Sequence, residues 1–180
     1  MMKARPLFIA LLAASAQLVA AQSTFFLVRH AEKAEAASGS QDAKDPALSE
    51  AGRARAESLA TLLKDAGISA IFATEFKRTQ QTAEPLAHAG SLAVEVIPAK
   101  ETAGLVSKLK ETQGNALVVG HSNTIPDILK ALGATVVYSI DEGDYDDLFV
   151  FVPGATPQLI RLHVPAPANL QKAGLAAPHD

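Results

Sequence analysis

Short apolar runs recur along the chain and alternate with longer amphipathic segments. Runs rich in β-branched and aromatic residues predict strands over residues 24–28, 68–74, 93–98 and 115–121. The core sequences "FFLV", "AIFA" and "ALVV" lack the apolar–polar alternation of a half-exposed strand. We therefore expect these strands to be buried on both faces, as in a parallel sheet covered by helices.

The segments between these runs carry helical signals. In residues 48–67, Leu59, Leu62 and Leu63 have helical spacing, Ser49 can cap the N-terminus, and a glycine ends the segment. Further helices are predicted over residues 76–90, 101–112 and 123–133. Pro85 is expected to bend or interrupt the first of these, whereas Pro126 fits the first turn of the last.

The remaining segments complete the prediction. Residues 34–46 are small and polar and are expected to form a loop. Residues 145–153 and 158–164 are predicted strands joined by a hairpin or a short crossover. The whole pattern predicts an α/β fold, a three-layer α/β/α sandwich with a mostly parallel central sheet.

The two ends of the chain differ in composition from the middle. Residues 1–21 begin with Lys3 and Arg5, continue with an apolar stretch and end in small residues, which predicts a signal peptide. Cleavage is expected after Ala21, with cleavage after Ala20 as the less favoured alternative. A membrane anchor is less favoured, because about 15 apolar residues fall short of the roughly 20 that span a bilayer. We expect a single domain over residues 22–165, a flexible Pro/Ala-rich tail over 166–180, and a periplasmic or secreted location.

Charge and cysteine content narrow the function classes. The chain has no cysteine, which excludes disulfides, thiolate catalysis and zinc–sulfur sites. Removal of residues 1–21 would change the formal net charge from −3 to −5, which disfavours nucleic-acid and anionic-membrane partners. The acidic stretch "DEGDYDD", residues 141–147, lacks the spacing of a calcium loop and is interpreted as a solvated loop.

Polar residues gather where the predicted strands end. Arg29 and His30 follow the first strand, and His121 ends the fourth. Ligands bind beyond the carboxyl ends of strands in such sheets, so the two histidines are expected to face one crevice. Arg78, shortly after the second strand, would add a second guanidinium group.

Two histidines and two arginines suit a phosphoryl group. Guanidinium groups fork onto phosphate oxygens, and a neutral His30 can attack phosphorus if its other ring nitrogen is held by an acceptor. The flanking arginines should disfavour its protonation, and His121 would donate a hydrogen bond to the phosphoryl oxygens. Thr74 and Ser122 either donate hydrogen bonds to phosphate or cap the segments that follow their strands.

Four motifs, "RHAEK", "LSEAGRARA", "TEFKRTQQTA" and "VVGHSNT", resemble in order and spacing the histidine phosphatase superfamily, in the branch of phosphoglycerate mutases and small phosphohistidine phosphatases. The resemblance implies a phosphoglycerate mutase-like fold, with His30 phosphorylated during turnover and Arg29, Arg78 and His121 forming the phosphate pocket. No metal or other cofactor is expected, because the arginines and histidines supply the positive charge that magnesium supplies in other phosphoryl-transfer sites.

The chain departs from the usual family pattern at two positions beside the nucleophile. Ala31 stands where glycine is usual, and Lys33 stands where the mutases often have serine. Lys33 either adds positive charge at the mouth of the pocket or points outward, and an outward orientation is favoured because lysine is usually solvated.

The family's proton donor is an acidic residue after the third strand. Glu101 is the preferred candidate, because it follows a strand end. Asp127 is the alternative, although a carboxylate in the first turn of a helix also has a structural explanation in the helix dipole.

These observations favour a metal-independent phosphomonoester hydrolase that acts on a small phosphorylated substrate through phosphohistidine. A phosphoglycerate mutase-like phosphotransferase is less favoured, because residues 34–46 offer only a short cover for the pocket. A module that binds phosphorylated ligands without turnover is the other alternative. No nucleic-acid partner, and no stable membrane association after signal cleavage, is expected.

Overall fold

A computed structural model describes residues 23–35, 41–136 and 138–164 of the chain. The predicted signal peptide and the predicted tail, residues 1–21 and 166–180, lie outside the described residues. No helix among the described residues is long and apolar enough to cross a membrane.

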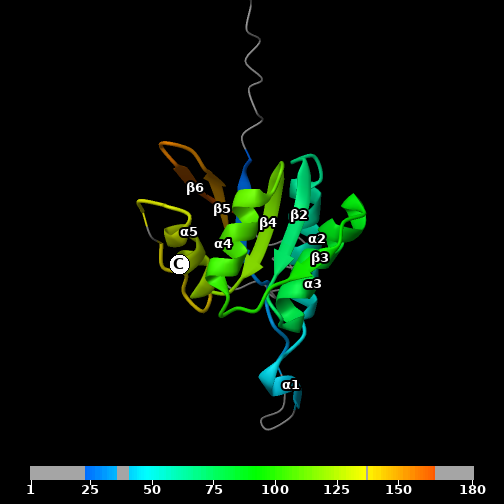
Figure 1. The fold of residues 1–180 in the computed structure, drawn as a ribbon. Helices are drawn as coiled ribbons and strands as arrows, with labels where there is room; N and C mark the ends of the chain where they lie inside the picture. Colours follow the sequence, from blue (N-terminus) through cyan, green and yellow to red (C-terminus); the bar gives the residue numbers. More distant parts are fainter. Residues whose placement is uncertain (1–22, 36–40, 137, 165–180) are drawn as a thin grey trace, which may run out of the picture.

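A six-stranded sheet in the order β3-β2-β4-β1-β5-β6 forms the centre of the domain (Figure 1). The first four strands of that order are parallel, and the last two form an antiparallel hairpin beside β1. This arrangement confirms the predicted α/β class and the mostly parallel sheet. The strands are β1 (Phe25–Arg29), β2 (Ile68–Ala73), β3 (Val94–Val96), β4 (Asn115–Gly120), β5 (Asp147–Val152) and β6 (Gln158–His163).

Two pairs of helices cover the two faces of the sheet (Figure 1). Alternate residues of β1 divide between two cores: Leu27 packs in the cluster that includes α4 and α5, and Val28 packs in the one that includes α2 and α3. The three predicted layers are therefore present. The helices are α2 (Glu50–Leu63), α3 (Lys77–Gly90), α4 (Thr102–Glu111) and α5 (Thr124–Ala131).

Local signals in the sequence account for one boundary and mislead at two others. Ser49 is the N-cap of α2, and its hydroxyl accepts a hydrogen bond from the Gly52 N–H at 3.0 Å. The prediction of a plain loop over residues 34–46 was wrong in part, because Gln41–Lys44 form the short helix α1 beyond the end of the sheet (Figure 1). The expected interruption at Pro85 was also wrong: α3 continues through it, and burial of Leu86 and Ala87 offsets the missing backbone hydrogen bond.

Candidate active site

The two histidines meet at the carboxyl ends of β1 and β4. These strands are parallel neighbours in register, with Arg29 opposite Gly120, and the His30 N–H donates to the Gly120 carbonyl at 2.9 Å. The imidazole centroids of His30 and His121 are 5.3 Å apart, with an angle of 67° between the rings. Both side chains, predicted to face one crevice, are therefore side by side, and only 4% and 8% of the two residues is exposed.

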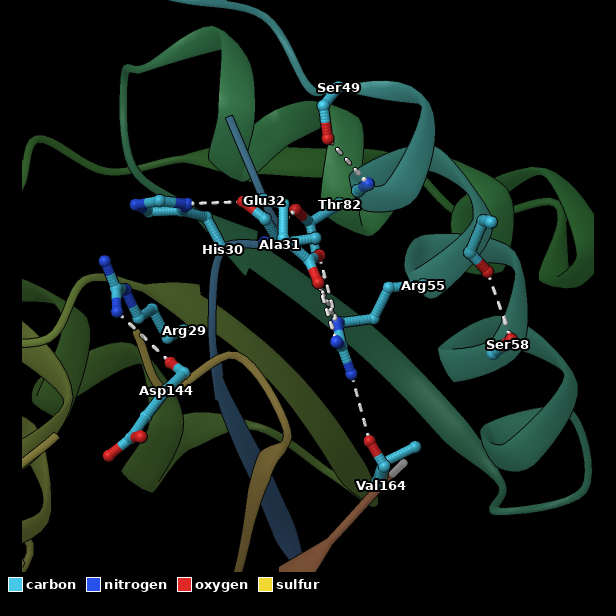
Figure 2. Close-up of polar contacts among 12 residues, drawn as sticks. Arg29, His30, Ala31, Glu32, Ser49, Arg55, Ser58, Thr82, Asp144 and Val164 are labelled. Carbon is cyan, nitrogen blue, oxygen red and sulfur yellow. Dashed lines mark hydrogen bonds and ion pairs between the residues drawn. The ribbon is translucent and has the colours of Figure 1, made fainter. Parts of the chain in front are cut away.

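The main chain holds the His30 ring. Nδ1 lies 2.7 Å from the Ala31 carbonyl oxygen, and a carbonyl only accepts, so Nδ1 carries the proton and Nε2 keeps its lone pair (Figure 2). The Ala31 N–H donates to the Thr82 hydroxyl at 3.0 Å, and that hydroxyl donates to the Arg78 carbonyl at 2.7 Å. Ala31, whose carbonyl holds His30, is thus itself anchored through its N–H to the first turns of α3.

Burial keeps both imidazoles neutral. It is the largest cause that lowers the pKa of His30 to about 3; the Ala31 carbonyl opposes this effect, and Arg78 and Arg29 add to it. Sequence reasoning attributed the neutral form to the guanidinium groups, whereas desolvation outweighs them. Burial, followed by the charge of Arg78, also lowers the pKa of His121 to about 4.

The segment before β5 surrounds the Arg29 guanidinium. Nη1 donates to the carbonyls of Asp141 at 2.6 Å and Asp144 at 3.2 Å, and Nη2 pairs with the Glu142 carboxylate at 3.0 Å (Figure 2 shows the contact with Asp144). The Tyr145 ring lies 4.4 Å from the centre of the guanidinium. The interpretation of residues 141–147 as a solvated acidic loop holds for the exposed Asp141, Glu142 and Gly143, but it missed that this loop also positions Arg29.

Arg78 lies in the first turn of α3, with its guanidinium 4.4 Å from the centre of the Phe76 ring and 3.7 Å from the Asp45 carboxylate. The Nε atoms of Arg29 and Arg78 are both buried, and neither has a hydrogen-bond partner among the described residues. Buried donors are nearly always paired, so two unpartnered donors in one place indicate a missing acceptor. An anion with several oxygens fits that requirement.

The four main predicted site residues line a cavity of about 390 Å³; they are Arg29, His30, Arg78 and His121. The exposed side chain of Lys33 also lines it, so this residue lies at its mouth.

The two hydroxyl residues have neither of the capping roles considered from the sequence. Ser122 lines the cavity and donates to Glu142 at 3.2 Å, but Asn123 is the N-cap residue of α5. Thr74 lies beneath His121, with its hydroxyl 2.9 Å from Nε2, and Phe76 is the N-cap residue of α3. Ser122 is therefore placed to meet a ligand, whereas Thr74 contacts the histidine.

Neither candidate proton donor lines this cavity. Glu101 is exposed at the N-terminus of α4 and lines a smaller, neighbouring apolar pocket, while Asp127 is exposed in the first turn of α5. β3 ends at Val96, so the chain turns into α4 and brings Ala99 to the cavity instead. Among the described residues, Glu142 is the one carboxylate that lines the cavity, and sequence reasoning missed it.

An ion pair behind the site ties α2 to the segment after His30. The Glu32 carboxylate receives hydrogen bonds from Nε and Nη2 of Arg55 at 2.6–3.0 Å, and Nη1 of Arg55 donates to the Val164 carbonyl (Figure 2). A side chain at Gly52 would overlap the Glu32 carbonyl oxygen, so only glycine allows this close approach. Glu32 therefore has a structural role here.

One cluster among the described residues has the composition of a metal site, namely Asp146, Asp147 and His163. It is not part of the histidine cavity, and Arg161 forms two hydrogen bonds of 2.6 and 2.8 Å to the Asp147 carboxylate. The guanidinium already neutralises the buried carboxylate, so the cluster is accounted for without an ion.

Comparisons with known proteins agree with this geometry. The family model described as histidine phosphatase superfamily (branch 1) matches residues 25–106. No protein in the curated set matches the chain. Solved structures do, among them a candidate phosphohistidine phosphatase, SixA, from Agrobacterium tumefaciens, with 27% identity, a TM-score of 0.60, and coverage of 77% of this chain and 97% of that chain.

Two further structures share the fold at lower identity. The protein histidine phosphatase SixA, complexed with tungstate, has 18% identity and a TM-score of 0.63, and the match covers 82% of this chain and 99% of that chain. A mycobacterial glucosyl-3-phosphoglycerate phosphatase, in complex with inorganic phosphate, has 15% identity and a TM-score of 0.61, with 81% and 98% covered.

Proposed function

We propose that this chain is a member of the histidine phosphatase superfamily, branch 1, and that it hydrolyses phosphomonoesters through a phosphohistidine on His30. The family and its structural neighbours support a phosphatase. The finer proposal depends on one observation. A neutral imidazole, with Nδ1 bound to a carbonyl, lies beside two guanidinium groups, and within the described part of the chain its Nε2 and their Nε donors have no partner.

The first step is an in-line displacement at phosphorus. His30 Nε2 forms a bond to phosphorus as the bond to the leaving oxygen breaks, while Nδ1–H stays on the Ala31 carbonyl. Arg29 and Arg78 stabilise the charge on the phosphoryl oxygens, which is the main requirement of phosphoryl transfer. These side chains supply the positive charge of the site, and the proposed reaction therefore uses no metal.

The leaving oxygen needs a proton, and we assign this role to Glu142 in place of Glu101. Glu142 lines the cavity, and its side chain is 80% exposed, so it can exchange protons with solvent. The carboxyl takes a proton from solvent and gives it to the leaving group. In the second step the carboxylate takes a proton from water as water attacks phosphorus and the P–N bond breaks.

Hydrolysis is favoured over transfer to a second substrate because water can reach the site. Lys33 and Glu142 are exposed where they line the cavity. The structural neighbours include a candidate phosphohistidine phosphatase and a glucosyl-3-phosphoglycerate phosphatase, which differ in substrate. We therefore propose a small phosphomonoester as the substrate class and take no individual substrate from those names.

The test uses the chain from residue 22 onward and a generic aryl phosphate, with and without a metal chelator. We expect hydrolysis that the chelator does not change, and an acid-labile, base-stable phosphoryl adduct on His30 after rapid quenching. His30→Ala should lack both. His88→Ala is the matched control, since His88 is an exposed histidine of α3. Hydrolysis without the adduct would overturn the proposal, and oxyanion binding without hydrolysis would favour a binding module.

Export is a separate proposal. It is supported by the residue pattern of the first 21 positions. Expression of the whole chain in a bacterium, followed by N-terminal sequencing of the periplasmic or extracellular protein, should give Gln22 as the first residue. A chain retained in the cytoplasm with Met1 intact would contradict it.

A further inference from the structure

A chain of hydrogen bonds runs from His121 into the protein. Nε2 of His121 lies 2.9 Å from the Thr74 hydroxyl, and that hydroxyl lies 2.9 Å from the hydroxyl of Thr79. The Thr79 hydroxyl is 2.7 Å from the Phe76 carbonyl and 3.0 Å from the Thr74 carbonyl. Both threonines are buried, and Thr79 is 0% exposed.

The carbonyls at the end fix the direction of the whole chain. A carbonyl oxygen only accepts, so the single Thr79 hydroxyl proton points to one of the two carbonyls. The Thr79 oxygen then accepts from the Thr74 hydroxyl, whose own oxygen is left to accept from His121 Nε2–H. The opposite direction would send the Thr79 proton to Thr74 and the Thr74 proton to His121 Nε2. It would leave the Thr79 hydroxyl oxygen facing two carbonyl oxygens without a proton between them, at the cost of an unmade hydrogen bond.

We propose that Thr74 and Thr79 are positioning residues that hold His121 as its Nε2–H tautomer, so that a phosphoryl dianion binds with uptake of one proton at His121 Nδ1. Nδ1 has no hydrogen-bond partner among the described residues, and the His121 side chain lines the cavity. Nδ1 is therefore the nitrogen available to a ligand. Without the added proton, its lone pair would face the oxygens of the anion.

The charges around His121 agree with a coupling between anion binding and proton uptake at its ring. Arg29 and His30 face it from the end of β1, and Glu142 from the segment before β5. Glu75 faces it from the connection after β2, and Arg78 from the first turn of α3. In the ligand-free protein, burial and the cations keep the ring neutral near pH 7, with a pKa of about 4.

A bound dianion reverses the balance, because it favours the charged ring over the neutral one. Affinity for a fully ionised oxyanion should therefore rise as pH falls below the pKa of His121 in the complex. It should level off near pH 4, where His121 of the free protein is already protonated.

The proposal assigns a specific role in catalysis to the second histidine. It rests on the proposed function only in taking an oxyanion as the ligand. The protonated Nδ1 donates to a phosphoryl oxygen, while Nε2–H stays on Thr74 and keeps the ring in place. No bond to His121 is made or broken, so its proton is carried from binding to release of phosphate.

Nuclear magnetic resonance of ¹⁵N-histidine in the chain from residue 22 tests the tautomer directly. Near pH 7 without ligand, we expect His121 to show a protonated Nε2 and an unprotonated Nδ1, with the signal assigned by its loss in His121→Asn. Saturation with sulfate should protonate Nδ1. An Nδ1–H tautomer in the free protein, or protonation at His30 in place of His121, would overturn the proposal.

Calorimetry with sulfate tests the coupling, because sulfate has no proton to exchange near neutral pH. Titration in two buffers of different ionisation enthalpy should show close to one proton taken up per sulfate bound. Thr74→Val should weaken sulfate binding about tenfold and reduce the uptake, since the charged ring loses an acceptor. Thr74→Ser keeps the hydroxyl and should behave as the unmodified protein does.

Thr61→Val is the matched control, because Thr61 is an exposed threonine of α2 whose hydroxyl donates to the Glu57 carbonyl. Equal behaviour of Thr74→Val and Thr61→Val, or sulfate binding without proton uptake, would refute the proposal. If Thr74→Val does not fold, Thr79→Val supplies the same comparison. Failure to hydrolyse any ester, with the tautomer and the uptake as expected, would overturn only the proposed function.

Discussion

The two histidines of the site are buried side by side, yet different parts of the chain hold them. The ring of His30 is fixed by a main-chain carbonyl that follows it directly in the sequence. The ring of His121 is fixed by the hydroxyls of Thr74 and Thr79, from the end of β2 and the start of α3. A main-chain contact survives any side-chain substitution, whereas a single substitution removes a hydroxyl. We therefore expect the geometry of His30 to be robust and that of His121 to be adjustable.

Removal of each ring should give the largest and most unequal effects. His30→Ala takes away the proposed nucleophile and should lower kcat/KM by about 10⁴-fold or more. His121→Ala removes one donor to the phosphoryl oxygens and should cost about 10²- to 10³-fold. Steady-state assays with an aryl phosphate measure both. Equal losses in the two variants would mean that the histidines do not divide the work in this way.

Removal of the proposed proton donor should cause the next largest loss of activity. Glu142→Gln keeps the shape of the side chain but cannot give up a proton, and we expect kcat to fall by about 10²-fold with substrates that have poor leaving groups. Substrates with good leaving groups should be affected less. Glu101→Gln is the control, because Glu101 lies outside the cavity. A larger loss in Glu101→Gln than in Glu142→Gln would restore the assignment made from the sequence.

Acid should destabilise the protein through both histidines. Their pKa values are lowered in the folded state, to about 3 for His30 and about 4 for His121, so below pH 6.5 the unfolded chain binds more protons than the folded one. The free energy of unfolding should fall on the order of a few kcal/mol between pH 6.5 and 4. Urea unfolding at several pH values measures this fall. A double variant, His30→Gln with His121→Gln, should show a shallower slope.

The smallest effect is expected from removing the Thr82 hydroxyl, which holds the main chain next to His30. Thr82→Val leaves the buried Ala31 N–H without an acceptor and should cost about 1–3 kcal/mol of stability. Because the Ala31 carbonyl stays in place, we expect kcat/KM to change less than tenfold. Urea unfolding and kinetics together measure the two quantities. A loss of activity as large as that of His121→Ala would show that the main-chain contact is not robust.

Much of this architecture could be predicted from the sequence. Continuous apolar runs identify buried strands, and polar residues just after them lie at the ligand-binding edge of the sheet, which places Arg29, His30 and His121 together. The N-cap at Ser49 is also readable, because its partner is three residues away. These features depend on local pattern or on a general rule of sheet topology.

Features that depend on distant contacts could not be predicted in the same way. Glu142 reaches Arg29 across 113 residues of chain, and the hydrogen bond between Thr74 and His121 spans 47. Glu101 does not line the cavity because β3 is only three residues long, so the chain reaches the cavity at Ala99. The small displacement of one strand end was enough to leave the expected acid in the neighbouring pocket.

The ion pair between Glu142 and Arg29 has a consequence for turnover. A carboxylate already sits on Nη2 of the arginine in the absence of ligand, with its second oxygen held by Ser122. A phosphoryl group that binds to Arg29 must displace the Glu142 carboxylate. Binding therefore exchanges one anion for another on the guanidinium. Because the same carboxylate can return to Arg29 when inorganic phosphate departs, we expect product inhibition to be weak.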